Sequence, residues 1–121
     1  MKKDINSNNE ELVDKVFKIL TKFKNSPKKI ENIFTELFEK DFDVQLNEIS
    51  KLENGLLKGL IISVKDLFDV KGYITRGGTK FLKPDISLSD AKCISNIRKA
   101  GGLLLGHTNM TELAYSGLGI N

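Results

Sequence analysis

The fold is decided by residues 59–78, GLIISVKDLFDVKGYITRGG. The first part of this stretch, Leu60 to Val64, is apolar and β-branched, with the length of a buried strand. It is followed at once by Lys65 and Asp66. A strand of this kind delivers such charges to the edge of a sheet, where sites on α/β proteins usually lie. The Gly77-Gly78 pair predicts a loop with positive φ angles or a close backbone approach.

The composition is that of a soluble globular protein. The chain has 121 residues, of which 40% are hydrophobic and 29% charged. This length is enough for one small domain that buries roughly two thirds of its unfolded surface. The net charge is only +3, and lysines are scattered among glutamates. That pattern indicates a solvated surface and argues against direct nucleic-acid binding.

Several classes of site and location are disfavoured. With one cysteine, Cys93, and one histidine, His107, neither a disulfide framework nor a metal site is expected. No apolar run approaches the ~20 residues of a membrane span. The opening MKKDINSNNEELVDK has no apolar segment behind its lysines, unlike a secretory signal. We therefore expect a cytoplasmic protein without cofactor or membrane contact, and the sequence leaves its oligomeric state open.

The first 54 residues are predicted to be mainly helical. A helix capped by Asn9 should run to about Lys24, where Asn25-Ser26-Pro27 breaks it. Its apolar stripe predicts packing on its own domain, although a membrane-surface or partner helix would look similar. The stripe comprises Leu12, Val13, Val16, Phe17, Ile19, Leu20 and Phe23. From Ile30 to Leu52 the apolar spacing is again helical, but it blurs near Phe42.

Residues 55–121 predict an α/β layer with a partly parallel sheet. After the strand at 60–64, residues 67–79 read as irregular backbone. A helix capped by Ser89 or Asp90 should reach Ala100, with Cys93 among its inward-facing residues. Leu103 to Leu105 form a second short buried strand. Asn109 and Glu112 resemble a capping box for a short helix that reaches about Tyr115.

Taken alone, Lys65 has two interpretations. A lysine after a strand is most often a solvated strand end. It can also act as a base, provided that it is neutral when it reacts, and desolvation at the closed end of a sheet favours that neutral form. For Asp66, direct chemistry and simple bonding to backbone amides are both open. His107 is expected to be a structural histidine, at the surface or half-buried.

Two longer stretches carry a family resemblance: KGLIISVKDLFDVKGYITRGGTKFL, and LSDAKCISNIRKAGGLLLGHTNMTELAYSGLGIN after it. They resemble the N-terminal part of the amidase signature family, over about residues 55 to 121. The family hydrolyses or transfers amides with a nucleophilic serine, a second serine on a cis peptide bond, and a lysine. The resemblance implies that Lys65 is this lysine, exchanging a proton with the bridging serine, and that the substrate is a small amide.

The resemblance also implies a fold and further site residues. It implies the start of the amidase fold, a mixed sheet flanked by helices and incomplete in this chain. It suggests a short strand near residues 33–35 and then a helix to about Leu52, where periodicity alone predicts one helix. Gly77-Gly78-Thr79 falls where many members carry a small residue followed by Gly-Ser, and both a plain turn and a loop that lines the site are open there. Tyr115 and Ser116 fall where members place residues along the substrate cavity.

The nucleophilic serine of the family is not recognised in this sequence. The Gly/Ser-rich segment with the two family serines normally follows the last motif seen here, and the sequence stops at Asn121. We therefore expect a truncated N-terminal part of an amidase, inactive alone. One alternative is the same part of a glutamyl-tRNA amidotransferase A subunit, although LFDVKG is closer to the general amidases. Another alternative is a non-catalytic module that keeps the shell of the fold and binds another chain.

Overall fold

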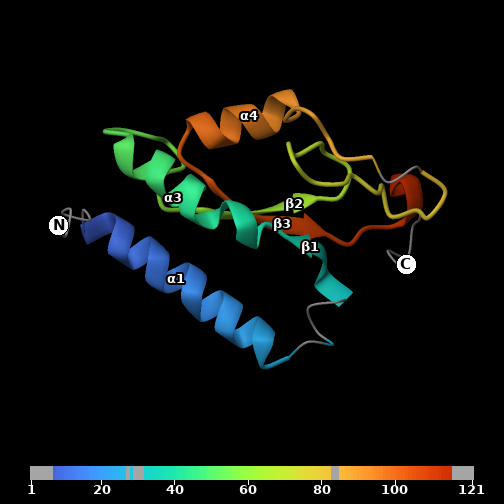
Figure 1. Ribbon diagram of the computed structural model, residues 1–121, viewed down its shortest axis with the longest axis horizontal. Coiled ribbons are helices and arrows are strands. Elements are labelled where there is room, and N and C mark those ends of the chain that lie inside the picture. Colours follow the sequence, from blue (N-terminus) through green and yellow to red (C-terminus); the bar gives the residue numbers. More distant parts are fainter. Residues whose placement is uncertain (1–6, 27, 29–31, 83–84, 116–121) are drawn as a thin grey trace.

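The computed structural model describes residues 7–26, 28, 32–82 and 85–115, and the order of its main elements is helix, strand, helix, strand, helix, strand (Figure 1). The helices are α1 (Ser7–Lys24), α3 (Phe42–Lys51) and α4 (Lys92–Lys99). The strands are β1 (Phe34–Leu37), β2 (Ile61–Lys65) and β3 (Leu103–Thr108). Two 3₁₀ turns, η1 (Glu39–Asp41) and η2 (Glu112–Ala114), complete the list.

The three strands form one mixed sheet in the order β1-β3-β2. β2 runs parallel to β3, with Lys65 opposite Thr108, whereas β1 runs antiparallel to β3. All of β3 from Leu103 to His107 is buried, as expected for a central strand covered on both faces. The expected mixed α/β architecture is therefore confirmed. Because β1 comes from the first 54 residues and pairs with β3, one sheet joins both predicted regions.

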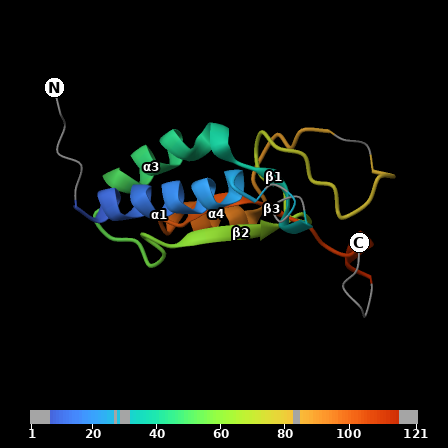
Figure 2. The same ribbon diagram turned by 90° about the horizontal axis from the view of Figure 1, so that it is seen from below.

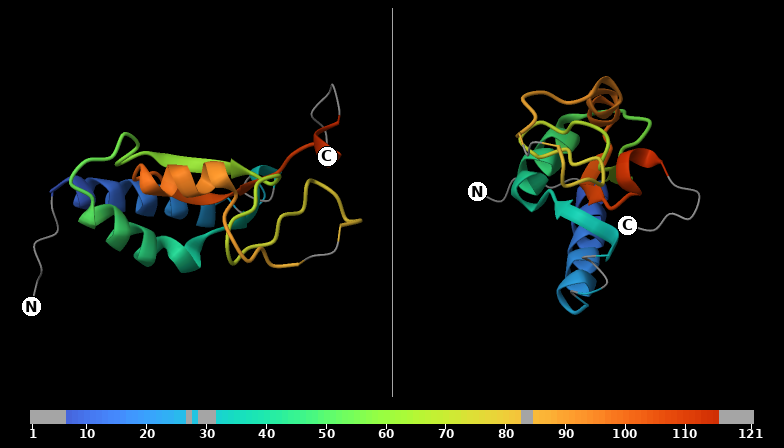
Figure 3. Two further views of the ribbon diagram at one scale, coloured as in Figure 1. Left: turned by 90° about the horizontal axis from the view of Figure 1, so that it is seen from above. Right: turned by 90° about the vertical axis from the view of Figure 1, so that its right-hand side faces the viewer.

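Helices cover both faces of this sheet. Figure 1 shows α4 and α1 on opposite sides of the strands, and the end-on view in Figure 3 shows α3 beside them. Figure 2 shows the extended loop after β2 gathered beyond one end of the sheet, away from the helices. Apolar residues from all these elements form a single core. Its buried members include Leu12, Val16, Phe38, Ile49, Val64, Val70, Ile94, Leu103 and Leu104.

The N-terminal half agrees with the family resemblance more closely than with periodicity. The helix predicted over residues 30–52 is interrupted: residues 32 and 33 are helical, β1 follows at Phe34–Leu37, and α3 begins at Phe42. Backbone pairing with β3 overrides the local helical spacing here. The cap predicted at Asn9 is wrong, because α1 begins at Ser7. In the apolar stripe of α1, Leu12 and Val16 are buried, whereas Phe17 is 70% exposed.

Helix α4 begins without the predicted side-chain cap. Its N-cap residue is Ala91, and the Asp90 carboxylate instead accepts hydrogen bonds from the Lys71 amide (2.8 Å) and Arg98 Nε (2.9 Å). Asp90 thus ties the loop after β2 to the last turn of α4. Ile94 is buried as expected, but Cys93 is exposed, which corrects the inward placement predicted for it.

Candidate functional site

Strand β2 carries Lys65 to the carboxyl end of the parallel pair. Lys65 is the last residue of β2, and the next amide, that of Asp66, still donates to the Thr108 carbonyl at 3.2 Å. The Lys65 side chain is exposed and has no hydrogen bond or ion pair with another described residue. The described residues therefore position this lysine without burying it.

Asp66 is held by the loop that follows it and lies fully buried. Its Oδ1 accepts a hydrogen bond from the Arg76 amide at 2.9 Å, and its Oδ2 accepts one from the Thr35 hydroxyl at 2.9 Å. The Asp66 carbonyl accepts from the Gly77 amide at 2.7 Å. Asp66 thus organises the loop through backbone amides, the structural alternative considered from the sequence.

The Gly77-Gly78 turn folds back over this end of the sheet. Both glycines have positive φ angles, 62° and 67°, as the sequence predicted. The turn helps to form a cavity of about 410 Å³ at the carboxyl end of the sheet. Asp66 and Asn109 line it together with Thr35, Arg76, Gly78, Thr79, Lys80, Phe81 and Glu112. Lys65 adjoins Asp66 in the chain but is not itself a lining residue.

His107 lies behind Asp66 and is fully buried, which corrects the surface or half-buried position expected for it. Its Nε2 is 3.0 Å from the Phe68 carbonyl oxygen, and its Nδ1 is 3.6 Å from Asp66 Oδ1. The sequence does hold a signal for this burial, because His107 directly continues the apolar run Leu103-Leu104-Leu105-Gly106. The expected strand ended at Leu105, whereas β3 extends to Thr108.

The segment after β3 differs from the predicted capping box and helix. Asn109 Oδ1 accepts a hydrogen bond from the next amide, that of Met110, at 2.9 Å. The helix shrinks to the turn η2, in which Leu113 has a left-handed backbone (φ 47°). Tyr115 follows this turn and is 92% exposed. Ser116 lies outside the described residues, so a substrate-binding role for Tyr115 and Ser116 stays a prediction.

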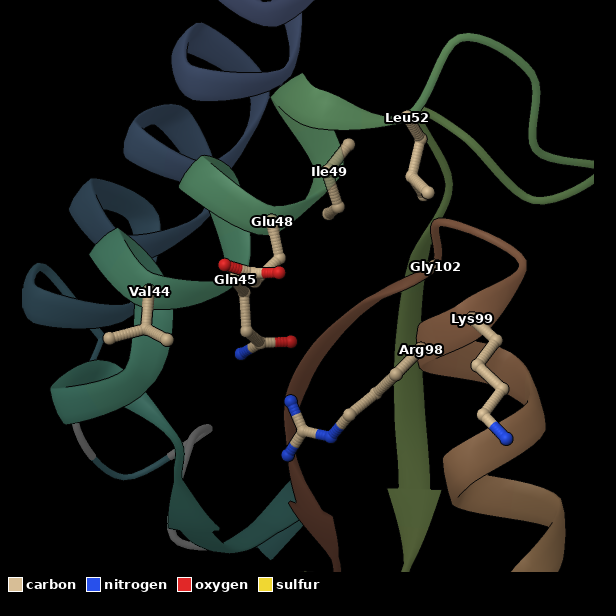
Figure 4. A pocket seen from close by; sticks show the side chains of 8 residues that line it. All are labelled: Val44, Gln45, Glu48, Ile49, Leu52, Arg98, Lys99 and Gly102. Atoms are coloured by element: carbon tan, nitrogen blue, oxygen red, sulfur yellow. The ribbon is translucent and has the colours of Figure 1, made fainter.

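A second cavity, of about 430 Å³, lies between α3 and α4 (Figure 4). Figure 4 shows the Arg98 side chain extending from α4 toward Gln45 on α3. Gly102, which also lines this cavity, precedes the first residue of β3. The cavity therefore lies toward the opposite end of the strands from Lys65, and it contributes no residue to the candidate site.

The described residues also bear on two other kinds of site, a metal centre and a membrane-spanning helix. Within the described part of the chain, no three His, Cys, Asp or Glu side chains are grouped so that they could hold a metal ion. None of the helices described is both long enough and apolar enough to cross a membrane.

A family model described as "Amidase" matches residues 14–120, most of the chain. This chain belongs to the amidase family. The match includes every element of the sheet and the end of β2 at Lys65.

Curated relatives of this amidase-family chain include A subunits of glutamyl-tRNA(Gln) amidotransferase. The subunit of Psychrobacter sp. (strain PRwf-1) is 47% identical over 62 residues, 51% of this chain and 12% of the relative. The subunit of Orientia tsutsugamushi (strain Ikeda) is 38% identical over 81 residues, which cover 67% of this chain and 15% of the relative. That of Sulfurisphaera tokodaii is 29% identical over 105 residues, covering 87% and 22%. The chain thus spans less than a quarter of the length of these relatives.

Solved structures support the same family. An inhibitor-bound structure, from work on a vestigial protein complex and the origins of an s-triazine catabolic enzyme, is 29% identical with a TM-score of 0.72. The match covers 91% of this chain and 24% of that one. A structure described as "Crystal structure of amidase" is 31% identical with a TM-score of 0.64, covering 85% and 24%. A bacterial aryl acylamidase, at 15% identity and a TM-score of 0.64, shares the fold.

Proposed function

We propose that this chain supplies the lysine of an amide-hydrolysing site, as the N-terminal part of an amidase signature enzyme. The observation that carries the proposal is the placement of Lys65. It ends a parallel strand directly before buried Asp66, within the segment that the amidase family model matches. Carboxyl ends of parallel strands are the usual location of active sites in α/β proteins.

In the proposed mechanism Lys65 is a proton carrier between serines. Neutral Lys65 accepts a proton from the bridging serine, which accepts one from the nucleophilic serine as that oxygen attacks the amide carbonyl carbon. Collapse of the tetrahedral intermediate breaks the C–N bond, and the proton returns through the same groups to the departing amine. Water then hydrolyses the acyl-enzyme. None of the described serines is hydrogen-bonded to Lys65. By the family resemblance, we assign both serines to a Gly/Ser-rich segment that is not recognised in the printed sequence.

The exposure of Lys65 has a direct consequence for this mechanism. Water favours the charged ammonium, and a lysine base works when it is desolvated. Because the described residues leave Lys65 exposed, other parts of the protein must cover it before it can act as a base. We accordingly expect the 121-residue chain to be inactive by itself.

The test is substitution of Lys65 in the full-length protein. Lys65→Ala should lower kcat for amide hydrolysis by about 10² to 10⁴, the usual contribution of a proton-transfer group. Lys65→Arg should be equally impaired, because a guanidinium keeps its charge and cannot accept a proton. Ammonia or amine release from a panel of primary amides, anilides and glutamine is the measurement.

Lys92→Ala is the matched control, since Lys92 is an exposed lysine in the first turn of α4. It should keep the rate of the unsubstituted protein. Full activity of Lys65→Ala would contradict the proposed role. Saturable amide hydrolysis by the 121-residue chain, lost on Lys65→Ala, would show that the required serines lie within this sequence.

The amidotransferase alternative is favoured by a specific observation, the curated relatives named above. Under this proposal the site would release ammonia from glutamine for a partner that modifies glutamyl-tRNA. Two results distinguish it from a general amidase: a strong preference for glutamine over other amides, and a rate that depends on added partner subunits. Efficient hydrolysis of unrelated amides by the isolated protein would favour the general amidase.

A cytoplasmic location and a non-catalytic binding module stay predictions that rest on the sequence alone. Both predictions concern the whole protein. The amidase-family relatives are about four to eight times longer than the part of them that this chain matches.

A further inference from the structure

The backbone turn that begins at Lys65 is tied to a buried ring. The Lys65 carbonyl accepts hydrogen bonds from the amides of Leu67 (2.6 Å) and Phe68 (3.1 Å), which bend the chain directly after β2. The carbonyl of Phe68 is in turn 3.0 Å from His107 Nε2. The far end of the turn is therefore anchored to β3, the strand that pairs with β2.

This contact fixes which nitrogen of the ring carries a proton. A carbonyl oxygen can only accept a hydrogen bond, so His107 Nε2 must be protonated and donate. The other nitrogen, Nδ1, then points toward Asp66 Oδ1 at 3.6 Å. Both side chains are fully buried, and Nδ1 has no hydrogen-bond partner among the described residues. A buried polar atom in this position needs an explanation beyond core filling.

The ring is also prevented from turning. The Phe38 ring contacts His107 edge to face, with centroids 4.9 Å apart and planes at 81°. The Asp66 carboxylate is fixed by the Arg76 amide, which donates to the same Oδ1 that faces His107, and by the Thr35 hydroxyl, which donates to Oδ2. The orientation of the His107 ring is therefore set by its contacts with Phe38, the Phe68 carbonyl and the Asp66 carboxylate.

We propose that His107 is a positioning residue for Lys65, a role that rests on the function proposed for Lys65. Its Nε2–H binds the Phe68 carbonyl, so that the far end of the Lys65–Phe68 turn is held by one buried ring, while its Nδ1 faces Asp66 Oδ1 at 3.6 Å without a hydrogen bond. The ring does not contact substrate. It sets the backbone geometry from which the lysine amine is presented.

The first experiment needs no enzymatic activity. His107 is the one histidine of this chain, so ¹⁵N-histidine labelling gives ring resonances that belong to it alone. We expect a single ring state with a protonated Nε2 whose hydrogen exchanges slowly with solvent. Asp66→Asn, which keeps the side-chain size and removes the charge, should shift the Nδ1 resonance. Rapidly exchanging ring protons, or a spectrum unchanged by Asp66→Asn, would overturn the proposal.

The second experiment separates positioning from simple core filling in the full-length enzyme. His107→Gln places an amide donor near the position of Nε2, whereas His107→Phe fills the space and removes both polar contacts. We expect kcat to fall at least tenfold in His107→Phe with KM changed less than threefold, and partial recovery of kcat in His107→Gln. Equal activity of the two variants with similar thermal midpoints would overturn the proposal.

The two experiments fail independently. If the full-length protein hydrolyses no amide, the function proposed for Lys65 fails, while the ring spectrum still decides whether His107 holds the turn. If hydrolysis requires Lys65 but is insensitive to the substitutions at His107, the amidase assignment stands and the positioning role is wrong.

Discussion

At the scale of single residues, Tyr73 is a buried phenol close to two carboxylates. Tyr73 is 5% exposed, and its Oη has no partner among the described residues. Burial, followed by the nearby Asp41 and Glu36 carboxylates, raises the pKa of Tyr73 to about 12. Deprotonation in the folded state would place a phenolate in an apolar, acidic setting, so the fold favours the neutral phenol.

The raised pKa predicts an alkaline dependence of stability. A folded-state pKa above the unfolded value of 10.0 stabilises the fold below pH 10, and this contribution is lost as the pH rises toward about 12. At ~1.4 kcal/mol per pKa unit, the loss is roughly 3 kcal/mol. Urea denaturation of the protein and of Tyr73→Phe between pH 8 and pH 12 measures it. The difference in unfolding free energy between the two should change with pH only above pH 10; parallel curves would refute the argument.

The residues that sequence reasoning placed best are those whose role is local. Gly77 and Gly78 have the positive φ angles that a glycine pair predicts. The position of Lys65 at the end of a strand follows from the apolar run before it. The burial of His107 and the exposure of Cys93 were misjudged, because both depend on how far β3 extends and on which face of α4 meets the sheet. The extent of β3 has a signal in the apolar run before His107, whereas the face that α4 turns toward the sheet is a tertiary fact that local spacing does not contain.

At the scale of elements, one side chain of α3 substitutes for a missing strand. β1 pairs with β3 at residues 106–108, and the Phe38 amide continues the pairing to the Leu105 carbonyl at 3.0 Å. Beyond that point the Gln45 side chain makes the hydrogen bonds to β3. Its Nε2 donates to the Leu104 carbonyl at 3.0 Å, and its Oε1 accepts from the Leu104 amide at 2.8 Å. The buried Gln45 side chain therefore satisfies both backbone groups of a central strand.

This arrangement predicts a large cost for an apolar replacement. Gln45→Leu keeps the approximate volume but leaves the amide and carbonyl of Leu104 buried without partners. At about 1 to 3 kcal/mol for each of the two unpaired groups, we expect the unfolding free energy to fall by roughly 2 to 6 kcal/mol. Urea denaturation at pH 7 measures the change, with Asn47→Ala on the exposed face of α3 as the control. A Gln45→Leu protein as stable as the control would show that these hydrogen bonds contribute little.

Sequence patterns did not predict the register of the sheet, because it depends on pairing between strands that are distant in the chain. The apolar spacing of residues 30–52 is compatible with one helix, and only pairing with β3, seventy residues away along the chain, converts Phe34–Leu37 into a strand. Gly106 shows how close this pairing is, because a Cβ there would lie 2.5 Å from the Glu36 carbonyl oxygen. The local sequence around β1 carries no sign of that partner.

At the scale of the whole molecule, the chain spans about a quarter or less of its amidase-family relatives, and its described surface has an unpaired strand edge and exposed apolar side chains. β2 is an edge strand of the described sheet, with β3 on one side only. Large apolar side chains also gather in the loop between β2 and α4. In this loop Phe81 and Leu88 are each 90% exposed, and Leu82 and Ile86 are more than half exposed. An apolar loop of this kind marks a surface that other protein normally covers.

The exposed loop predicts measurable binding of a neutral hydrophobic dye by the 121-residue chain. Nile red fluorescence should rise on mixing, and the double substitution Phe81→Ser with Leu88→Ser should reduce this rise, because it removes the two most exposed large apolar side chains of the loop. The matched control, Lys80→Ser with Asp85→Ser, changes two exposed polar residues of the same loop and should leave the signal unchanged. Far-ultraviolet circular dichroism should be the same for all three proteins, since none of these side chains belongs to the core. A self-contained binding module would give the opposite result: a defined oligomer on size exclusion, with little dye bound because the loop is already covered by a second copy.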